Sequence, residues 1–256
     1  ATVLCYWPDY SIKWVLLDFQ TDLQAKQTAS FALQYGTQVK RAPITRPLQI
    51  AEGQTALTVN TGRLQVELPR DKSALLGKVW LDSNADGRFS DDEIISDGGQ
   101  SLLTAGGKAG TAQPATLRIM RRGPLHSIIR VDGGLKGENA ALGDQADLHF
   151  YAGRSDVVVH HTFTNTNTTK TFSELNSLTL TQSLALGDGA KGQFGPDGSR
   201  SVTAPALLPQ QGATLWQGFD DNFRVTGLGA DSSGKRAANW GDVTGSKAGL
   251  TVAVRY

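Results

Sequence analysis

Apolar and polar residues alternate along many short segments of this chain. Leu64, Val66 and Leu68 are apolar, whereas the residues between them are polar. This two-residue period is typical of a β-strand with one buried face. Glycine, proline, asparagine and aspartate follow such segments at short intervals, which favours tight turns over long helices. The pattern therefore predicts an all-β fold.

The predicted strands are short and rich in aromatic or β-branched residues. They cover residues 2–6, 11–20, 30–35, 56–60, 63–68, 78–81, 116–122, 125–131, 147–152, 156–164, 177–186, 214–219, 223–226 and 250–255. Two packed antiparallel sheets are the simplest way for so many strands to bury one face each. We therefore expect a large antiparallel β-sandwich, with the glycine-rich segments 106–112 and 187–198 as surface loops.

Residues 39–54 lack this period and contain Pro43, Pro47 and Gly53. Such a composition is typical of a crossing between two domains. We therefore place a domain boundary near residue 50. Residues 1–50 would form a compact β unit with its linker, and residues 51–256 the main β-sandwich domain.

Composition narrows the classes of partner. The chain has 256 residues and is 39% hydrophobic, enough for a substantial core. Lys plus Arg number 25 against 24 for Asp plus Glu, so no global positive field draws nucleic acid. No apolar run reaches the roughly 20 residues of a membrane-spanning helix. We expect neither nucleic acid nor membrane as a partner, and we interpret the single cysteine, Cys5, as a small buried hydrophobe.

Residues 82–93 match the pattern of a calcium-binding loop at every position. Gly87 allows the sharp turn that this loop requires. Calcium takes roughly six to eight oxygen ligands, and the spacing of this segment can bring that kind of atom to one point. The predicted ligands are Asp82, Asn84, Asp86, the main-chain carbonyl of Arg88, Ser90 directly or through water, and bidentate Glu93. The cofactor expected from the sequence is therefore calcium.

The same residue types also build ordinary polar turns, which is the alternative interpretation of this segment. Residues 78–81 have the character of a strand rather than of an entering helix. A bound ion would therefore be a structural clip inside a β protein, not half of a paired calcium sensor.

Two stretches resemble proteins of the exo-rhamnogalacturonan lyase-like family. The sequences WPDYSIKWVLLDF at 7–19 and FALQYG at 31–36 are similar to the end of that family's N-terminal β-barrel domain. The run from NTGRL at 60–64 through HFYAG at 149–153 to GLTVAVR at 249–255 is similar to its central, galactose mutarotase-like β-sandwich. The resemblance covers most of the chain and implies a partial β-barrel domain followed by that sandwich.

The resemblance also implies an activity and partners. The family's chemistry is β-elimination on an acidic pectin backbone, in which a base removes the proton beside a uronate carboxylate. An (α/α) toroid that follows the sandwich supplies much of the active cleft. The chain is thus expected to be an internal piece of a longer, secreted or periplasmic protein. Its expected partners are an acidic plant-type polysaccharide and the missing C-terminal helical domain, and the chain alone is expected to be inactive.

Several polar residues near position 150 could carry proton-transfer chemistry. His149 and Tyr151 lie on one predicted strand and His160 on the next, with Arg154 between them. Pairing of these strands could place imidazole, phenol and guanidinium groups on one face. In the alternative interpretation, one or more of the histidines, including His161, occupy ordinary polar or packing positions.

Four further residues could contact an acidic sugar. Arg118 and Arg122 belong, with Arg121 and Arg130, to a basic group on consecutive predicted strands and could bind uronate carboxylates. Trp216 and Trp240 could stack on sugar rings. The alternatives are a solvated sheet face for the arginines and core positions for the tryptophans.

Two functional hypotheses follow from these observations. In the first, the chain is the non-helical portion of a polysaccharide lyase-like protein that acts on rhamnogalacturonan or a related uronate polymer, with a structural calcium site. In the second, it is a non-catalytic, calcium-stabilised β-sandwich that binds glycan or scaffolds neighbouring domains. Release of an unsaturated, ultraviolet-absorbing product would distinguish the two.

Overall fold

The computed structural model describes residues 1–40, 42–137, 140–169, 172–197, 200–203, 212–219, 221–227 and 232–254. Within these ranges the chain is built from β-strands and one short 3-10 helix. The described strand pairs are antiparallel. The all-β, antiparallel fold expected from the sequence is confirmed.

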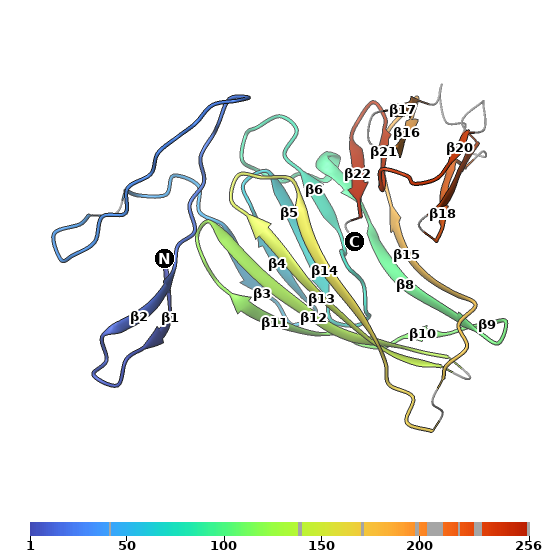
Figure 1. Cartoon of the computed structure of the whole chain (residues 1–256), viewed down its shortest axis with the longest axis horizontal. Coiled ribbons are helices and arrows are strands. Elements are labelled where there is room, and N and C mark those ends of the chain that lie inside the picture. Colours follow the sequence, from blue (N-terminus) through green and yellow to red (C-terminus); the bar gives the residue numbers. More distant parts are fainter. Residues whose placement is uncertain are drawn as a thin grey trace. The chain divides into compact units, whose positions relative to one another are not determined.

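The chain divides into two compact units (Figure 1). The first unit comprises Ala1–Ile94 and Gly98–Gln182, and the second comprises Ile95–Asp97 and Ser183–Tyr256. The boundary expected near residue 50 falls within the first unit, and it stays a prediction.

The first unit contains most of the strands. They are β1 (Thr2–Tyr6), β2 (Ile12–Leu16), β3 (Gln49–Glu52), β4 (Ala56–Asn60), β5 (Leu64–Pro69), β6 (Val79–Leu81), β8 (Gly98–Ala105), β9 (Lys108–Ala109), β10 (Thr111–Ala112), β11 (Thr116–Arg121), β12 (His126–Lys136), β13 (Ala141–Tyr151), β14 (Val157–Asn165) and β15 (Ser177–Ser183), with the 3-10 helix η1 (Asp91–Glu93). Strand β7 (Ile94–Ser96) leads from the first unit into the second.

Two five-stranded sheets form the body of the first unit. One has the order β3-β4-β5-β6-β7, and the other has the order β10-β12-β13-β14 with β11 also paired to β12. Each sheet buries one face, as the predicted alternation requires. The buried positions include Leu57, Val59, Val66 and Leu68 in the first sheet and Ile129, Val131, Leu148 and Phe150 in the second.

Backbone hydrogen bonds join the ends of the two sheets. The amide of Leu48 donates to the carbonyl of Pro124, and the amide of Gly153 donates to the carbonyl of Thr61. Two sheets that each bury one apolar face and are tied at their edges form a β-sandwich. The opposite face of the β11–β14 sheet is polar, and that face carries the candidate site described below.

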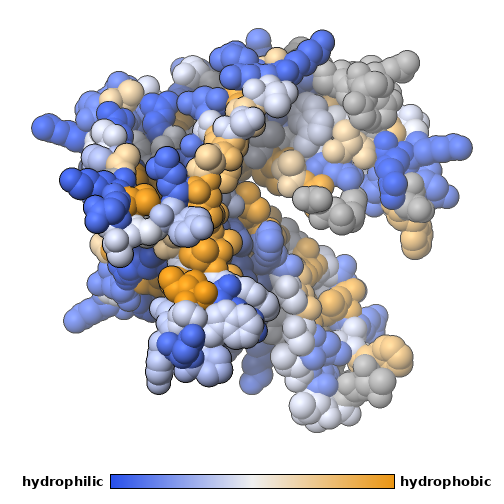
Figure 2. Space-filling model, turned by 60° about the vertical axis from the view of Figure 1, so that its left-hand side comes forward, coloured by the Kyte–Doolittle hydropathy of each residue, from blue (hydrophilic) through white to orange (hydrophobic). Residues whose placement is uncertain are grey.

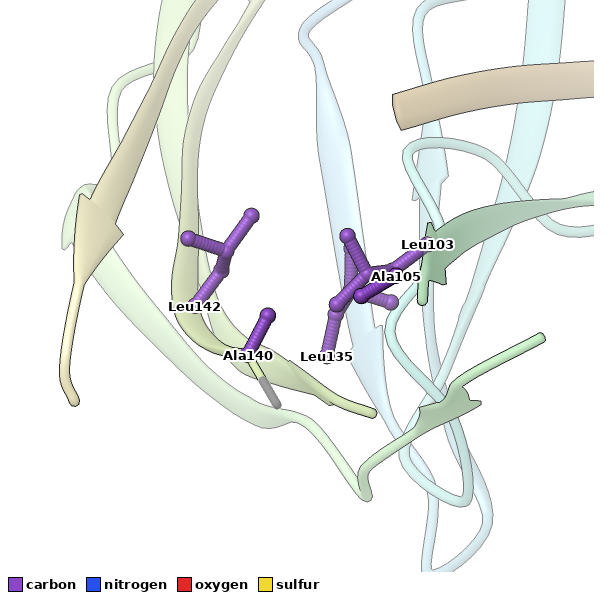
Figure 3. Packing of buried hydrophobic residues seen from close by; sticks show 5 residues of the cluster. All are labelled: Leu103, Ala105, Leu135, Ala140 and Leu142. Carbon is purple, nitrogen blue, oxygen red and sulfur yellow. The ribbon is translucent and has the colours of Figure 1, made fainter. Parts of the chain in front are cut away.

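A second patch of the core lies beneath the third sheet of the first unit, which has the order β15-β8-β9. Leu103 and Ala105 of β8 pack against Leu135 of β12 and Leu142 of β13, with Ala140 beside them. Figure 3 shows these five side chains gathered between β8 and the β12–β13 hairpin. Strand β8 was not among the predicted strands, because its sequence GGQSLLTA begins with two glycines and places its two leucines side by side rather than in alternation.

The second unit is also antiparallel. Its strands are β16 (Lys191–Asp197), β17 (Arg200–Thr203), β18 (Thr214–Gly218), β19 (Asn222–Thr226), β20 (Ser232–Gly234), β21 (Trp240–Thr244) and β22 (Gly249–Ala253). They form the sheets β17-β16-β21-β22 and β18-β19-β20. Phe223, Val225 and Ala237 make a small buried core.

The N-terminal segment is the least covered part of the first unit. Within the described ranges, strands β1 and β2 pair only with each other, and a two-stranded ribbon has no layer to bury its side chains. Apolar residues consequently reach the surface on the side that Figure 2 brings forward. The exposed large side chains are Leu4, Tyr6, Trp7, Tyr10, Ile12, Trp14, Val15, Leu17, Phe19, Leu23, Phe31, Leu33, Tyr35, Val39 and Ile44. For the same reason Cys5, which we expected to be buried, is only partly covered.

Candidate functional site

The strand register places a set of polar side chains on the solvent-facing side of the β11–β14 sheet. Directly paired residues of antiparallel strands point to the same face. Arg118 pairs with Arg130, Arg130 with Asp147, and Asp147 with His160. These four residues therefore form one polar row across four strands.

A neighbouring part of the same face carries aromatic and imidazole rings. His126 pairs with Tyr151, and His149 lies one pleat further along β13. The rings of His126 and Tyr151 stack with their centroids 4.5 Å apart, and the rings of His149 and His160 lie 4.8 Å apart. The structure thus brings His149, Tyr151 and His160 together, and it adds His126, which is isolated in the sequence.

Hydrogen bonds order this cluster. Nε2 of His126 lies 3.0 Å from Nδ1 of His149. Nη1 of Arg121 lies 3.0 Å from Nδ1 of His126 and 3.3 Å from Oδ1 of Asp18. His126 is buried, and the side chains of Arg121 and Asp18 are largely covered. We define the histidine cluster as Asp18, Arg121, His126, His149, Tyr151 and His160.

Two groups on this face, His149 and Asp147, have a pKa below the ordinary value. Burial lowers the pKa of His149, and the nearby His126 and His160 act in the same direction. His149 therefore favours its neutral form. The hydrogen bond from Arg130 lowers the pKa of Asp147, so that carboxylate keeps its charge beside the histidines.

The arginines of this region are already paired with carboxylates. Arg118 bonds to Asp132, Arg122 bonds to Glu52, and Arg130 bonds to Asp147 at 2.7 Å. The side chains of Arg118 and Arg122 are more than half exposed, so a ligand carboxylate can compete for them. Their ion pairs leave less positive charge for a ligand than the sequence alone indicates.

Among the described residues, the other sequence-predicted site residues make no side-chain hydrogen bond to the histidine cluster, although Arg154 lies close enough to Tyr151 to interact with it electrostatically. Arg154 follows β13 in a turn, where its guanidinium bonds to Asp156 at 2.6 Å on an exposed surface. Trp216 and Trp240 belong to the second unit. Trp216 is about half exposed and Trp240 is partly buried. The candidate arginines and tryptophans therefore fall in different units.

His161 faces the opposite side of the sheet from His149 and His160. It forms an ion pair with Asp144, which also accepts a 2.5 Å hydrogen bond from Ser73. Burial raises the pKa of Asp144, but the hydrogen bonds from His161 and Ser73 outweigh it and hold the pKa below its ordinary value. The nearby hydroxyl of Ser101 also lowers the pKa of Asp144. Its oxygen makes no hydrogen bond of normal geometry within the described residues. This packing role fits the alternative interpretation of His161.

The loop at residues 82–93 is folded back on itself. Main-chain amides of Asp86 and Gly87 donate to the two carboxylate oxygens of Asp82, each at 3.1 Å. The amide of Asp86 also donates to Oδ1 of Asn84, and the amide of Arg88 donates to Oδ1 of Asp86. Gly87 has a φ of 77°, a value that a residue without a Cβ adopts at no steric cost. The predicted turn at Gly87 is therefore present.

Glu93 closes this loop. Its Oε1 accepts the amide of Ser83 and its Oε2 accepts the amide of Ser90, each at 3.2 Å. Strand β6 precedes the loop, and the short helix η1 ends it at Glu93. The expected strand, rather than a helix, thus leads into the loop.

Two carboxylates of the loop are buried. Asp82 is 0% exposed and Glu93 is 4% exposed, yet the ion pairs among the described residues include neither of them. A buried carboxylate without a positive partner is costly. Across the described ranges, no group of three or more His, Cys, Asp or Glu side chains is arranged to hold a metal ion. The predicted ligands are a mixed set, with an amide, a hydroxyl and a main-chain carbonyl beside three carboxylates.

Neither protein-family models nor curated proteins give a match to this chain. In the described part of the structure, every helix is too short or too polar to cross a membrane.

Proposed function

We propose that this chain is the β-sandwich portion of a polysaccharide lyase-like protein that acts by β-elimination on rhamnogalacturonan or a related uronate polymer. The polar face of the β11–β14 sheet would contact the polymer. The observation that carries this proposal is the histidine cluster, in which Tyr151, His126, His149 and His160 share one face.

The chemistry of this face suits an acidic sugar chain. Imidazole and phenol groups donate and accept hydrogen bonds with hydroxyl groups, and aromatic rings stack on apolar sugar faces. Exposed Arg118 lies on the same sheet and can exchange its bond to Asp132 for a bidentate bond to a uronate carboxylate. A sheet face of this kind fits an extended polymer rather than a small molecule in a closed pocket.

β-Elimination needs a base next to a positive group that stabilises the developing negative charge. His149, Tyr151 and His160 are candidates for proton transfer, whereas Arg118, Arg122 and Arg130 are engaged by carboxylates. We therefore propose that the protein has a C-terminal helical domain, which supplies part of the catalytic charge. The paired arginines also favour the second hypothesis, a non-catalytic glycan-binding or scaffolding sandwich.

We further propose that the loop at 82–93 binds calcium as a structural ion. Its ligands would be Asp82, Asn84, Asp86, the carbonyl of Arg88, Ser90 and Glu93. The buried charges of Asp82 and Glu93 support this proposal, because a bound cation removes the cost of burying them. A secreted or periplasmic location would supply enough calcium for a site of modest affinity.

The exposed apolar residues of the N-terminal segment support the interpretation of residues 1–50 as part of a β-barrel-like domain. Contiguous exposed apolar surface is normally covered by a partner. The remaining strands of such a domain would pair with the free edges of β1 and β2 and bury residues such as Trp14 and Phe31.

Activity on pectic polymers tests the catalytic proposal. We expect the chain alone to give no unsaturated product, and the full-length protein with its helical domain to give a steady rise in ultraviolet absorbance. Tyr151→Phe in that protein should lower kcat by about 10²-fold or more if its phenol transfers the proton. The rate should be unchanged in Tyr10→Phe, because Tyr10 lies on the exposed N-terminal segment.

Two outcomes separate the hypotheses. A full-length protein that binds pectic polymers without forming product would leave the non-catalytic sandwich as the function. A product rate that Tyr151→Phe does not change would remove Tyr151 from the reaction but leave β-elimination in place.

A further inference from the structure

The hydrogen bonds of the histidine cluster decide which ring nitrogens carry protons. Nη1 of Arg121 lies 3.0 Å from Nδ1 of His126, and a guanidinium group can only donate hydrogen bonds. A proton on Nδ1 would place two donors 3.0 Å apart. Nδ1 of His126 must therefore offer its lone pair to Arg121.

Asp18 does not reverse this assignment. Its Oδ1 lies 3.4 Å from Nδ1 of His126, whereas Nη1 of Arg121 lies 3.0 Å from that nitrogen, so Arg121 is the nearer hydrogen-bond partner. Nη1 of Arg121 carries two hydrogens, so it can donate one hydrogen bond to Asp18 at 3.3 Å and another to His126 at 3.0 Å. The carboxylate of Asp18 thus orients the guanidinium of Arg121, which in turn donates a hydrogen bond to the imidazole of His126.

The protonation of His126 also determines which nitrogen of His149 carries a proton. A neutral His126 that accepts on Nδ1 carries its proton on Nε2. That Nε2 lies 3.0 Å from Nδ1 of His149, so His149 must accept on Nδ1 and carry its own proton on Nε2. Within the described part of the chain, Nε2 of His149 has no hydrogen-bond partner.

We propose that Arg121 acts through His126 to hold His149 in the Nε2-protonated tautomer, so that His149 presents an N–H donor to an oxygen of a bound uronate. Arg121 and His126 are positioning residues, and His149 is the ligand-contacting residue. The ligand in this proposal rests on the proposed function, whereas the tautomer rests on the contacts alone. His149 is then a hydrogen-bond donor rather than the base, and Tyr151 and His160 remain candidates for proton abstraction.

The surroundings of His149 agree with a neutral donor. Burial and the neighbouring His126 and His160 lower the pKa of His149, so a second proton is disfavoured. Asp147 is the nearby carboxylate on the same strand, and its charge is engaged by Arg130. The neutral imidazole therefore keeps one proton, and Arg121 decides which nitrogen holds it.

Nitrogen-15 NMR of the histidine rings, recorded at about pH 8 where an ordinary histidine is neutral, tests this tautomer. In the wild-type chain His149 should show a protonated Nε2 and an unprotonated Nδ1. In Arg121→Met, His126 should move its proton to Nδ1 facing Asp18, and Nδ1 of His149 should shift toward the protonated value. Arg121→Lys restores a donor and should keep the wild-type pattern. So should Arg118→Met, which removes the same charge from the same strand, β11, at a side chain that bonds to Asp132.

A wild-type His149 protonated on Nδ1 would overturn the proposal without any variant. So would a His149 pattern in folded Arg121→Met identical to that of the wild type.

Binding of a galacturonate–rhamnose oligosaccharide tests the ligand. His149→Leu should weaken binding about tenfold or more, and His149→Gln, whose amide is also a donor, should recover most of it. Equal affinity of His149→Leu and wild type would overturn the contact to His149. Failure of the wild type to bind would overturn the proposed function and the ligand with it, while the NMR pattern still decides the role of Arg121.

Discussion

Replacing Asp144 by alanine is expected to lower the free energy of unfolding by about 3–5 kcal/mol, because breaking a buried ion pair leaves its partner uncompensated. Asp144 is 4% exposed and bonds to both His161 and Ser73. Its loss would leave the largely covered imidazole of His161 and the buried hydroxyl of Ser73 without an acceptor. Urea denaturation followed by fluorescence measures the difference.

Asp132→Ala is the matched control for this variant. Asp132 also bonds to a cationic side chain of the same unit, but its partner Arg118 is 60% exposed. An exposed pair contributes about 1 kcal/mol or less. Equal losses in the two variants would contradict the account of Asp144 as a buried structural charge.

The same residue predicts how stability depends on pH. The folded pKa of Asp144 lies below its ordinary value of 3.8, so the unfolded chain takes up a proton there first. Its contribution is fully present above about pH 3.8 and is lost as the pH falls through the folded value. His149 acts in the same direction below its ordinary value of 6.5, because burial lowers its folded pKa and the unfolded chain protonates first. The free energy of unfolding should therefore decrease as the pH falls. In Asp144→Ala, the part of this decrease that occurs below about pH 3.8 should be absent.

Adding calcium to chelator-treated protein is expected to raise Tm by roughly 5–10 °C. An ion that binds only the folded chain contributes about 2.7 kcal/mol at a concentration 100 times its Kd, and about 1 kcal/mol shifts Tm by roughly 2–4 °C for a chain of this size. Glu93→Gln should abolish the shift, since Glu93 is the buried carboxylate that closes the loop. Differential scanning calorimetry gives the measurement.

Asp91→Asn provides the control, because Asp91 lies in the same loop but on its exposed side, outside the predicted ligands. It should keep most of the calcium shift. An unchanged Tm in the wild type on adding calcium would rule out a structural ion and favour an ordinary polar turn at 82–93.

Local alternation predicted the strands that bury one face. Leu64, Val66 and Leu68 point into the core from β5, as their spacing indicates, and β1 has the predicted bounds. The predicted loop at 187–198 was wrong, because β16 occupies Lys191–Asp197. The glycines and the proline of this segment are typical of a loop, so its composition does not indicate a strand. The strand forms because β16 pairs with β21, and local composition does not show such pairing. Likewise, β9 and β10 lie within the predicted loop at 106–112.

The site was predictable only where its residues are close in sequence. His149 and Tyr151 alternate on one strand, so their common face follows from the two-residue period. The alternation also separates His160 from His161. In contrast, His126 and Asp18 join the cluster across long stretches of chain. The register of the β12–β13 hairpin would have identified His126 opposite Tyr151. No local pattern indicates Asp18, and the sequence marks Arg121 only as a member of the basic group with Arg118, Arg122 and Arg130, not as a partner of His126.

Chemical-shift mapping of the chain during titration with a galacturonate–rhamnose oligosaccharide tests the central claim most directly. We predict saturable shifts at His126, His149, Tyr151 and His160, with small or no changes around Trp216 in the second unit. Shifts confined to the second unit, or none at millimolar oligosaccharide, would contradict a uronate-binding face on the β11–β14 sheet.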